Sequence, residues 1–134
     1  MEIVENLPLS QFYHISVDND TPYNVYGGLQ DNGSWYGPSA APGGIKAKHW
    51  NVVGRGDGFR VLRHPTKNII YSEMQGAESV WRYDVDNKLV KTIQPLQERG
   101  LPDFRFNWNT PITVTNNQPN RIYIGSQFLH KSED

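Results

Sequence analysis

The sequence of 134 residues contains no cysteine. This excludes a disulfide framework, a thiolate nucleophile and a zinc site built on cysteine. It also lacks an excess of charge of one sign, because 13 Lys and Arg stand against 14 Asp and Glu. Binding to a phosphate backbone or an anionic bilayer needs an excess of basic residues, which this sequence does not have. We therefore expect neither nucleic acid nor a membrane as partner. No apolar run approaches the length of a spanning helix, and the mean hydropathy is -0.66.

Motifs of cofactor and metal sites are missing as well. The four histidines are scattered without metal-ligand spacing, and the sequence has neither a nucleophile elbow nor a phosphate loop. They are His14, His49, His64 and His130. The sequence therefore predicts no metal and no cofactor. Residues 1–10 show no basic segment followed by a long apolar stretch, so no signal peptide is expected and the compartment stays open.

Aromatic residues, glycine and proline are plentiful. Aromatics make up 12% of the chain, which is typical of a folded domain rather than a disordered segment. The 12 Gly and 9 Pro indicate frequent turns, so long helices are not expected.

Three segments of the chain resemble one another: 12–30, 59–75 and 111–127. Each begins with an alternating apolar run and passes through a polar turn. It then reaches a β-branched residue, a Tyr, three further residues and a Gln. The tyrosines are Tyr26, Tyr71 and Tyr123, and the glutamines are Gln30, Gln75 and Gln127. A shared offset in three places indicates an internal repeat.

A period of about 40 to 50 residues with strand patterning is typical of one blade of a β-propeller. We therefore predict an all-β fold of four-stranded antiparallel blades, with about three blades in one partial propeller unit, 1–134. Its parts are an orphan outer strand at 1–6, blade 1 at 11–53, blade 2 at 57–95 and an incomplete blade 3 at 110–134. The expected strands are 13–17, 24–30, 33–36, 50–53, 59–63, 69–75, 80–85, 89–93, 112–115 and 121–127.

The two ends of this predicted unit complement each other. Blade 3 lacks an outer strand, and 1–6 is a strand without a blade. Three blades alone would leave unpaired strand edges, which folded proteins pair, cover or abolish. Because propellers typically have 4 to 8 blades, we expect a homo-oligomer, with a dimer favoured, in which two chains complete a six-bladed ring.

Four stretches suggest a family: Val25–Trp35, Gly56–Phe59, Arg105–Pro111 and Lys131–Asp134. Together they resemble the bacterial sortilin/Vps10-like propellers with BNR (Asp-box) repeats, which are related to the xyloglucanase propellers and labelled glycosyl-hydrolase-like. The last stretch is similar to the opening of an Asp-box, without its Gly and Trp. Members of this family are much longer, so the chain resembles a fragment or a miniature of them. Many members are secreted, but for this chain the resemblance alone suggests that compartment.

The predicted propeller places one set of polar and aromatic residues on loops at one mouth of the ring. These ligand-binding candidates are Gln30, Asp31, Asp57, Gln75, Arg105, Asn107, Trp108 and Gln127. The function we expect is a non-catalytic binding module that takes a carbohydrate or a peptide at this mouth. Two alternatives stay open: a glycoside hydrolase of the xyloglucanase type, and a purely structural fragment that assembles with itself.

Several of these candidates also have an architectural interpretation. A repeated Gln at a strand end favours an amide that satisfies backbone groups of the neighbouring blade. Asp57 lies between glycines, where capping of its own turn is favoured over ligand binding. The alternate aromatics Phe104, Phe106 and Trp108 favour a packed core over a surface for sugar stacking.

Glycoside hydrolysis needs two carboxylates that flank the scissile bond. Asp31, Asp57 and Glu73 are weak candidates for these roles. The acidic motifs of the xyloglucanase type are not recognisable in the sequence. The prediction therefore leans against catalysis.

Overall fold

The computed structural model describes residues 10–117 and 121–133. Within these ranges the chain is built from strands, and its helical pieces are two single turns of 3-10 helix, Ala47–His49 and Gln75–Ala77. The expectation of an all-β chain without long helices is confirmed. In the same ranges no helix is long and apolar enough to cross a membrane.

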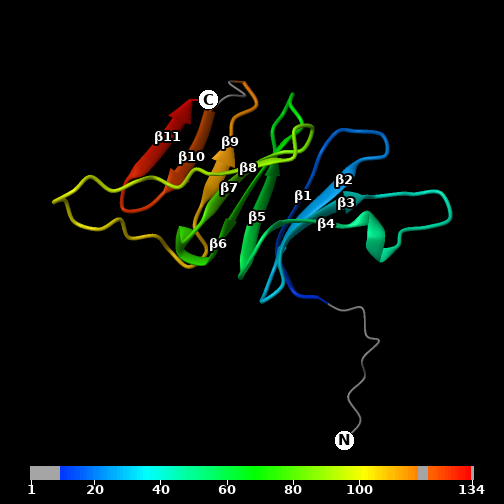
Figure 1. Ribbon diagram of the computed structural model, residues 1–134, viewed down its shortest axis with the longest axis horizontal. Coiled ribbons are helices and arrows are strands. Elements are labelled where there is room, and N and C mark those ends of the chain that lie inside the picture. Colours follow the sequence, from blue (N-terminus) through cyan, green and yellow to red (C-terminus); the bar gives the residue numbers. More distant parts are fainter. Residues whose placement is uncertain (1–9, 118–120, 134) are drawn as a thin grey trace, which may run out of the picture.

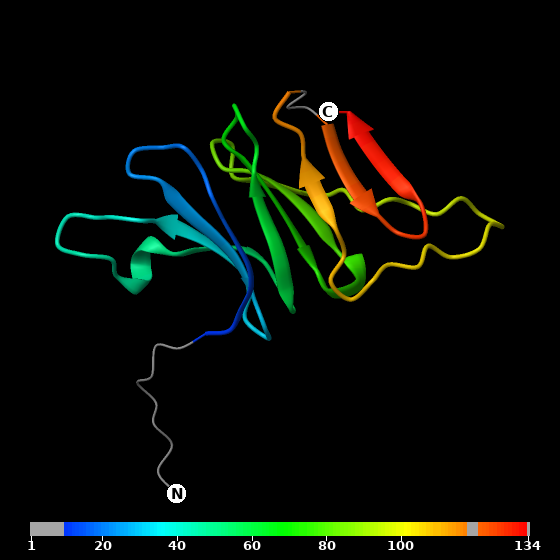
Figure 2. The ribbon, with the colours of Figure 1, turned by 180° about the vertical axis from the view of Figure 1, so that it is seen from behind.

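The strands form three antiparallel sheets that lie side by side in chain order (Figures 1 and 2). Sheet 1 consists of β1 (Phe12–Val17), β2 (Asn24–Leu29), β3 (Gly33–Pro38) and β4 (Asn51–Gly54). Sheet 2 consists of β5 (Gly58–Arg63), β6 (Ile69–Met74), β7 (Val80–Asp84) and β8 (Leu89–Thr92). Sheet 3 consists of β9 (Ile112–Val114), β10 (Arg121–Gly125) and β11 (Leu129–Glu133). Strands that pair are consecutive in the chain.

The strand segments expected from the repeat all occur as strands, and their ends differ from the prediction by at most two residues. Sheets 1 and 2 have the expected four strands, and the described part of sheet 3 has three. The expected outer strand at 1–6 lies outside the described residues. The alternating runs locate the inner strands well because one face of a strand such as β6 or β10 packs on a neighbouring sheet.

Sheet 2 lies between the other two sheets and packs against both of them. Tyr26 and Val53 of sheet 1 share one buried apolar cluster with Val61 and Ile70 of sheet 2. A second cluster joins sheet 2 to sheet 3 and is the larger of the two. It contains Ile69, Tyr71, Ala77, Val80, Ile112, Ile122 and Ile124. The core is therefore two thin apolar layers between successive sheets.

The Tyr of the repeat has a clear packing role in the first two sheets. Tyr26 is 1% exposed against sheet 2, and Tyr71 is 0% exposed against sheet 3. The β-branched residue just before the Tyr points to the opposite side, because side chains alternate along a strand. Ile70 and Ile122 are buried against the preceding sheet in this way. Each sheet thus has a forward face, toward the next sheet in the chain, and a backward face.

Sheets 1 and 2 approach each other closely where β2 crosses β5. A Cβ added to Gly28 would collide with the backbone of Gly58 and Phe59, so only glycine fits there. Side-chain hydroxyls also bond across the joint: Ser16 Oγ donates to the carbonyl oxygen of Val61 at 2.6 Å. Ser72 Oγ donates to the carbonyl oxygen of Val53 at 2.5 Å. The joint is therefore held by hydrogen bonds as well as by apolar packing.

Candidate functional site

A series of hydrogen bonds crosses all three sheets at the end where the β2–β3 and β6–β7 turns lie. The backbone N–H of Asp31 donates to Oδ1 of Asp57 at 2.6 Å. The N–H of Asp57 donates to Oε1 of Gln75 at 2.9 Å, and the N–H of Gln75 returns a bond to the carbonyl oxygen of Asp57 at 3.0 Å. The N–H of Gly76 donates to the carbonyl oxygen of Trp108 at 2.9 Å. Four of the predicted ligand-binding residues are therefore linked at one end of the molecule.

These bonds repeat from one sheet to the next. In sheets 1 and 2 the residue that follows the repeated Gln is Asp31 or Gly76, and it donates its N–H to the segment that leads into the next sheet. In sheet 3 the corresponding residue is Phe128, whose N–H donates locally to Oγ of Ser126 at 3.0 Å. The cross-sheet bond thus belongs to the repeat.

Asp57 is held in a loop of glycines. Gly56 has a φ of +69°, which glycine adopts without strain, and its carbonyl oxygen accepts the N–H of Gly33 at 2.8 Å. The Asp57 carboxylate accepts from sheet 1 rather than from its own turn. The carboxylate therefore forms a hydrogen bond between two sheets. The sequence had suggested only two roles for it, capping of its own turn and ligand binding.

Tyr13 joins this end of the molecule, although the sequence analysis did not select it. Its ring stacks on Phe59 with centroids 4.3 Å apart. Partial burial raises the pKa of the Tyr13 phenol, and the negative charges of Asp57 and Asp31 raise it further, while a hydrogen bond with the Trp108 indole acts the other way. In the sequence Tyr13 is simply the first residue of an expected strand. The structure adds a register shift of β1 between Phe12 and His14, which simple alternation does not predict.

Trp108 is the large aromatic side chain of this group that meets solvent. It is 57% exposed, whereas Phe104 and Phe106 are half-buried. Phe104 lies edge-on to Phe106 and to the ring of His130, with centroids 6.2 and 4.5 Å apart. The aromatic loop therefore divides: two rings pack inward and one indole stays accessible. We name Tyr13, Asp31, Asp57 and Trp108 the mouth cluster.

The remaining candidates, on sheet 3 and on the segment that leads into it, form a second group. The N–H of Arg105 donates to Oε1 of Gln127 at 2.7 Å, and Nε2 of Gln127 donates to the carbonyl oxygen of Asp103 at 3.1 Å. Arg105, Asn107 and Gln127 line a shallow hollow together with Pro111, Gly125 and Ser126. Arg105 and Asn107 are exposed.

The repeated glutamines do satisfy backbone groups, but not those of a neighbouring sheet. Gln75 accepts from Asp57, which leads directly into β5 of its own sheet. Gln127 accepts from Arg105, on the segment that leads into β9 of its own sheet. Gln30 contributes main-chain groups: its N–H donates to the carbonyl oxygen of Gln11 at 3.0 Å, and its own carbonyl oxygen accepts Nδ2 of Asn32 at 3.0 Å. In sheets 2 and 3 the side-chain amide therefore holds the segment that enters the sheet against the second strand.

Glu73 does not reach the surface of the mouth. It is 0% exposed, and its Oε1 accepts the N–H of Arg60 at 3.0 Å. Among the described residues Oε2 has no hydrogen-bond partner. Burial raises the pKa of Glu73 to about 7, against the opposing hydrogen bond and charge of Arg60. A carboxyl enclosed in this way cannot touch a substrate, so its position does not suit catalysis.

A row of polar side chains links the first strands of sheets 1 and 2 to the segment that precedes sheet 3. Nη1 of Arg60, on β5, donates to Oδ1 of Asn109 at 2.6 Å and lies 3.2 Å from the carbonyl oxygen of Thr110. Nδ2 of Asn109 lies 3.0 Å from Nε2 of His14, on β1. This row ties β1, β5 and the segment before β9 together.

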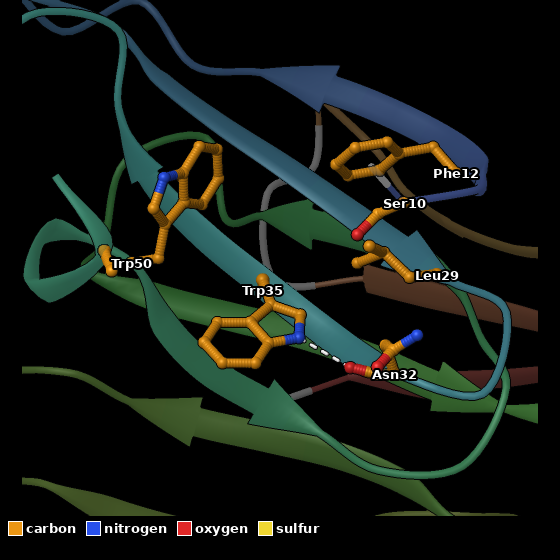
Figure 3. Close-up of a pocket in the computed structure, with 7 residues that line it drawn as sticks. Ser10, Phe12, Leu29, Asn32, Trp35 and Trp50 are labelled. Carbon is orange, nitrogen blue, oxygen red and sulfur yellow. Dashed lines mark hydrogen bonds between the residues drawn. The ribbon is translucent and has the colours of Figure 1, made fainter. Parts of the chain in front are cut away.

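An aromatic cleft lies on the backward face of sheet 1, where the sequence analysis had selected no residue (Figure 3). Its lining includes Phe12 and Leu29 from β1 and β2, Trp35 from β3, and Trp50 from the turn before β4. Nε1 of Trp35 donates to the carbonyl oxygen of Asn32 at 2.6 Å, as the dashed line in Figure 3 shows. Trp35 and Trp50 line the same cleft because β3 pairs with β4, a relationship that no local spacing encodes.

The described residues hold no group of three or more His, Asp or Glu arranged to bind a metal ion. No family model, no curated protein and no solved structure matches the chain.

Proposed function

We propose that the chain is a non-catalytic β-propeller binding module and that its ligand is a carbohydrate bound at the mouth cluster. In this proposal the three sheets are blades, and a second copy completes the ring. The resemblance to the sortilin/Vps10-like BNR propellers supports the assignment of the sheets as blades. The packing of Tyr26 on sheet 2 and of Tyr71 on sheet 3 supports it as well.

The observation that carries the proposal is an exposed indole beside two carboxylates and a phenol. A flat apolar face such as that of Trp108 packs on the C–H face of a sugar ring. The carboxylates of Asp31 and Asp57 accept hydrogen bonds from sugar hydroxyls, and the hydroxyl of Tyr13 lies close to both. An apolar platform with a few convergent polar groups is the usual make-up of a small-ligand site.

The mouth cluster also has a stable frame. Asp31 and Asp57 are held by the bond between them, and Trp108 is held through its carbonyl oxygen and through the hydrogen bond between its indole and Tyr13. The indole is 57% exposed, so a ligand can reach its face while the bonds keep its position. Binding groups on a preorganised frame lose less conformational entropy when the ligand arrives.

The experiment is a titration of the full chain with soluble β-glucans and a glycan array, followed by calorimetry on the best ligand. Trp108→Ala should abolish binding and leave the melting temperature within about a degree or two, because exposed side chains contribute little to stability. Tyr23→Ala is the matched control: Tyr23 is 49% exposed and precedes β2, at the opposite end of that strand from the β2–β3 turn.

Each other outcome selects one of the alternatives. Binding of peptides but not glycans, lost in Trp108→Ala, would replace the carbohydrate with a peptide. Turnover of a glucan that depends on Asp31 and Asp57 would establish a glycoside hydrolase instead. Absence of any ligand across the array would leave the structural role and contradict the proposal.

A further inference from the structure

Equivalent positions in the three sheets differ sharply in exposure, and the differences fall only at the two ends of the row. On the backward faces, Ile15 is 61% exposed, whereas Val61 and Ile112 are 2% and 4% exposed. These three residues correspond because they pair with Gly27, Ser72 and Ile124, each one residue after the repeated Tyr. Sheet 1 therefore has the same kind of backward face as sheets 2 and 3, but no other sheet of the described residues lies behind it.

The forward faces show the reverse pattern. Leu129 of sheet 3 is 73% exposed, whereas Ser34 of sheet 1 and Val80 of sheet 2 are 0% and 2% exposed. These three correspond because they pair with Gly125, Gly28 and Glu73, each two residues after the repeated Tyr. In sheets 1 and 2 the following sheet covers this position. In sheet 3 no other sheet of the described residues covers this position.

From these two patterns we infer that two copies of this chain close into a ring, with the forward face of sheet 3 in each copy packed on the backward face of sheet 1 in the other. The inference deepens the proposed function and rests on its assignment of the sheets as blades. The chain packs a forward face on a backward face twice within itself, and the two open faces are one of each kind. A second copy is therefore an occupant of the right shape, and two copies make two identical joints.

The chemistry of the two open faces fits this joint. The backward face of sheet 1 is apolar, with Ile15 and Val17 61% and 58% exposed and the aromatic cleft beside them. The forward face of sheet 3 presents Leu129 and the half-buried Tyr123, whose counterparts Tyr26 and Tyr71 are buried by the next sheet. A large exposed apolar sheet face is a liability unless a partner covers it.

Charged groups on the forward face of sheet 3 do not exclude such a joint. Glu133 there pairs with Arg121 at 2.9 Å and with Lys131 at 3.0 Å. Lys131 lies opposite Tyr123, just as Arg82 lies opposite Tyr71 in sheet 2. Arg82 is half-buried on a face that already packs against sheet 3. A basic residue at this position is therefore compatible with a packed joint.

The test is the mass of the full chain in solution, by light scattering after size exclusion. We expect twice the chain mass of 15.3 kDa for the natural sequence. Ile15→Asp and Leu129→Asp should each halve the mass, because each places a charge in both joints. Leu96→Asp is the matched control: Leu96 is 84% exposed on the segment between β8 and β9, and its variant should stay dimeric. Circular dichroism and a thermal melt verify that each variant is folded.

Mixing the two variants makes the test specific. A pair with one Ile15→Asp copy and one Leu129→Asp copy keeps one joint entirely natural, so the mixture should regain dimers that neither variant forms alone. A natural chain that stays at 15.3 kDa would overturn the inference. A dimer that Ile15→Asp dissociates but Leu129→Asp leaves intact would also overturn it, since two backward faces would then meet. Glycan binding by a monomer would separate this failure from that of the proposed function.

Discussion

The N–H of Asp31 and the carboxylate of Asp57 form a 2.6 Å hydrogen bond that joins sheet 1 to sheet 2 beside the exposed indole of Trp108. The bond gives Asp57 two tasks: its Oδ1 holds the sheets together, and its negative charge acts on the mouth cluster. Substitutions at this position can separate the two tasks.

We expect Asp57→Ala to lower the free energy of unfolding by about 1 to 2 kcal/mol, because a hydrogen bond to a charged acceptor is lost. Asp57→Asn keeps an oxygen acceptor for the Asp31 N–H and should cost less than half as much. Urea denaturation at pH 7 measures both values. Equal losses in the two variants would show that the carboxylate does not hold the joint through this bond.

Asp57→Asn also tests the charge on Tyr13. The carboxylate of Asp57 contributes to the raised pKa of the phenol, so its removal should lower that pKa. A spectrophotometric titration of the tyrosines, with Tyr13→Phe as the subtraction control, measures the change. An unchanged Tyr13 titration would place Asp57 away from the phenol.

Glu73 predicts a pH dependence of stability with a definite sign. Its pKa is about 7 in the folded chain and 4.5 in the unfolded chain, so the unfolded state releases this proton at lower pH. The stabilisation is fully present below pH 4.5 and is lost as the pH rises through 7. By linkage, the loss between pH 4.5 and pH 8 is about 3 kcal/mol.

Glu73→Gln should remove this loss, because the amide does not ionise. The difference in unfolding free energy between the variant and the natural chain should therefore grow in favour of the variant as the pH rises from 4.5 to 8. Glu78→Gln, at an exposed position, is the control and should show no such trend. A parallel pH profile for Glu73→Gln and the natural chain would show that Glu73 is ionised or solvated in the folded state.

Gly28→Ala should strongly disrupt the joint between sheets 1 and 2. The new Cβ would collide with the backbone of Gly58, which cannot move away as a flexible side chain would. We expect a loss of about 3 kcal/mol, at the upper end of overpacking effects. Gly43→Ala meets no atom within 4 Å but has a φ of +76°, so it carries only the backbone cost of roughly 1 kcal/mol. Thermal melts that rank Gly43→Ala as the more damaging change would contradict the close approach.

The strands were predictable because the same residue types recur at the same offsets in each repeat. A Tyr on the forward face and a β-branched residue on the backward face mark β2, β6 and β10 in the sequence, and their hairpin partners follow from alternation. The side-chain partners were less predictable. The β1 register shift beside Tyr13 and the placement of Trp35 and Trp50 in one cleft depend on the register between paired strands, which alternation does not fix. Alternation within β6 likewise did not reveal that Glu73 is fully enclosed.

The most direct test of the ring uses the absence of cysteine from the chain. Copies carrying Ile15→Cys are mixed with copies carrying Leu129→Cys, treated with a short bis-maleimide and separated on a denaturing gel. In the ring, the two engineered thiols lie on facing sides of one joint, whereas two identical thiols lie in different joints. We therefore predict a cross-linked dimer from the mixture and only traces from either variant alone. Cross-linking of Ile15→Cys with itself, or no cross-link in the mixture, would contradict the ring.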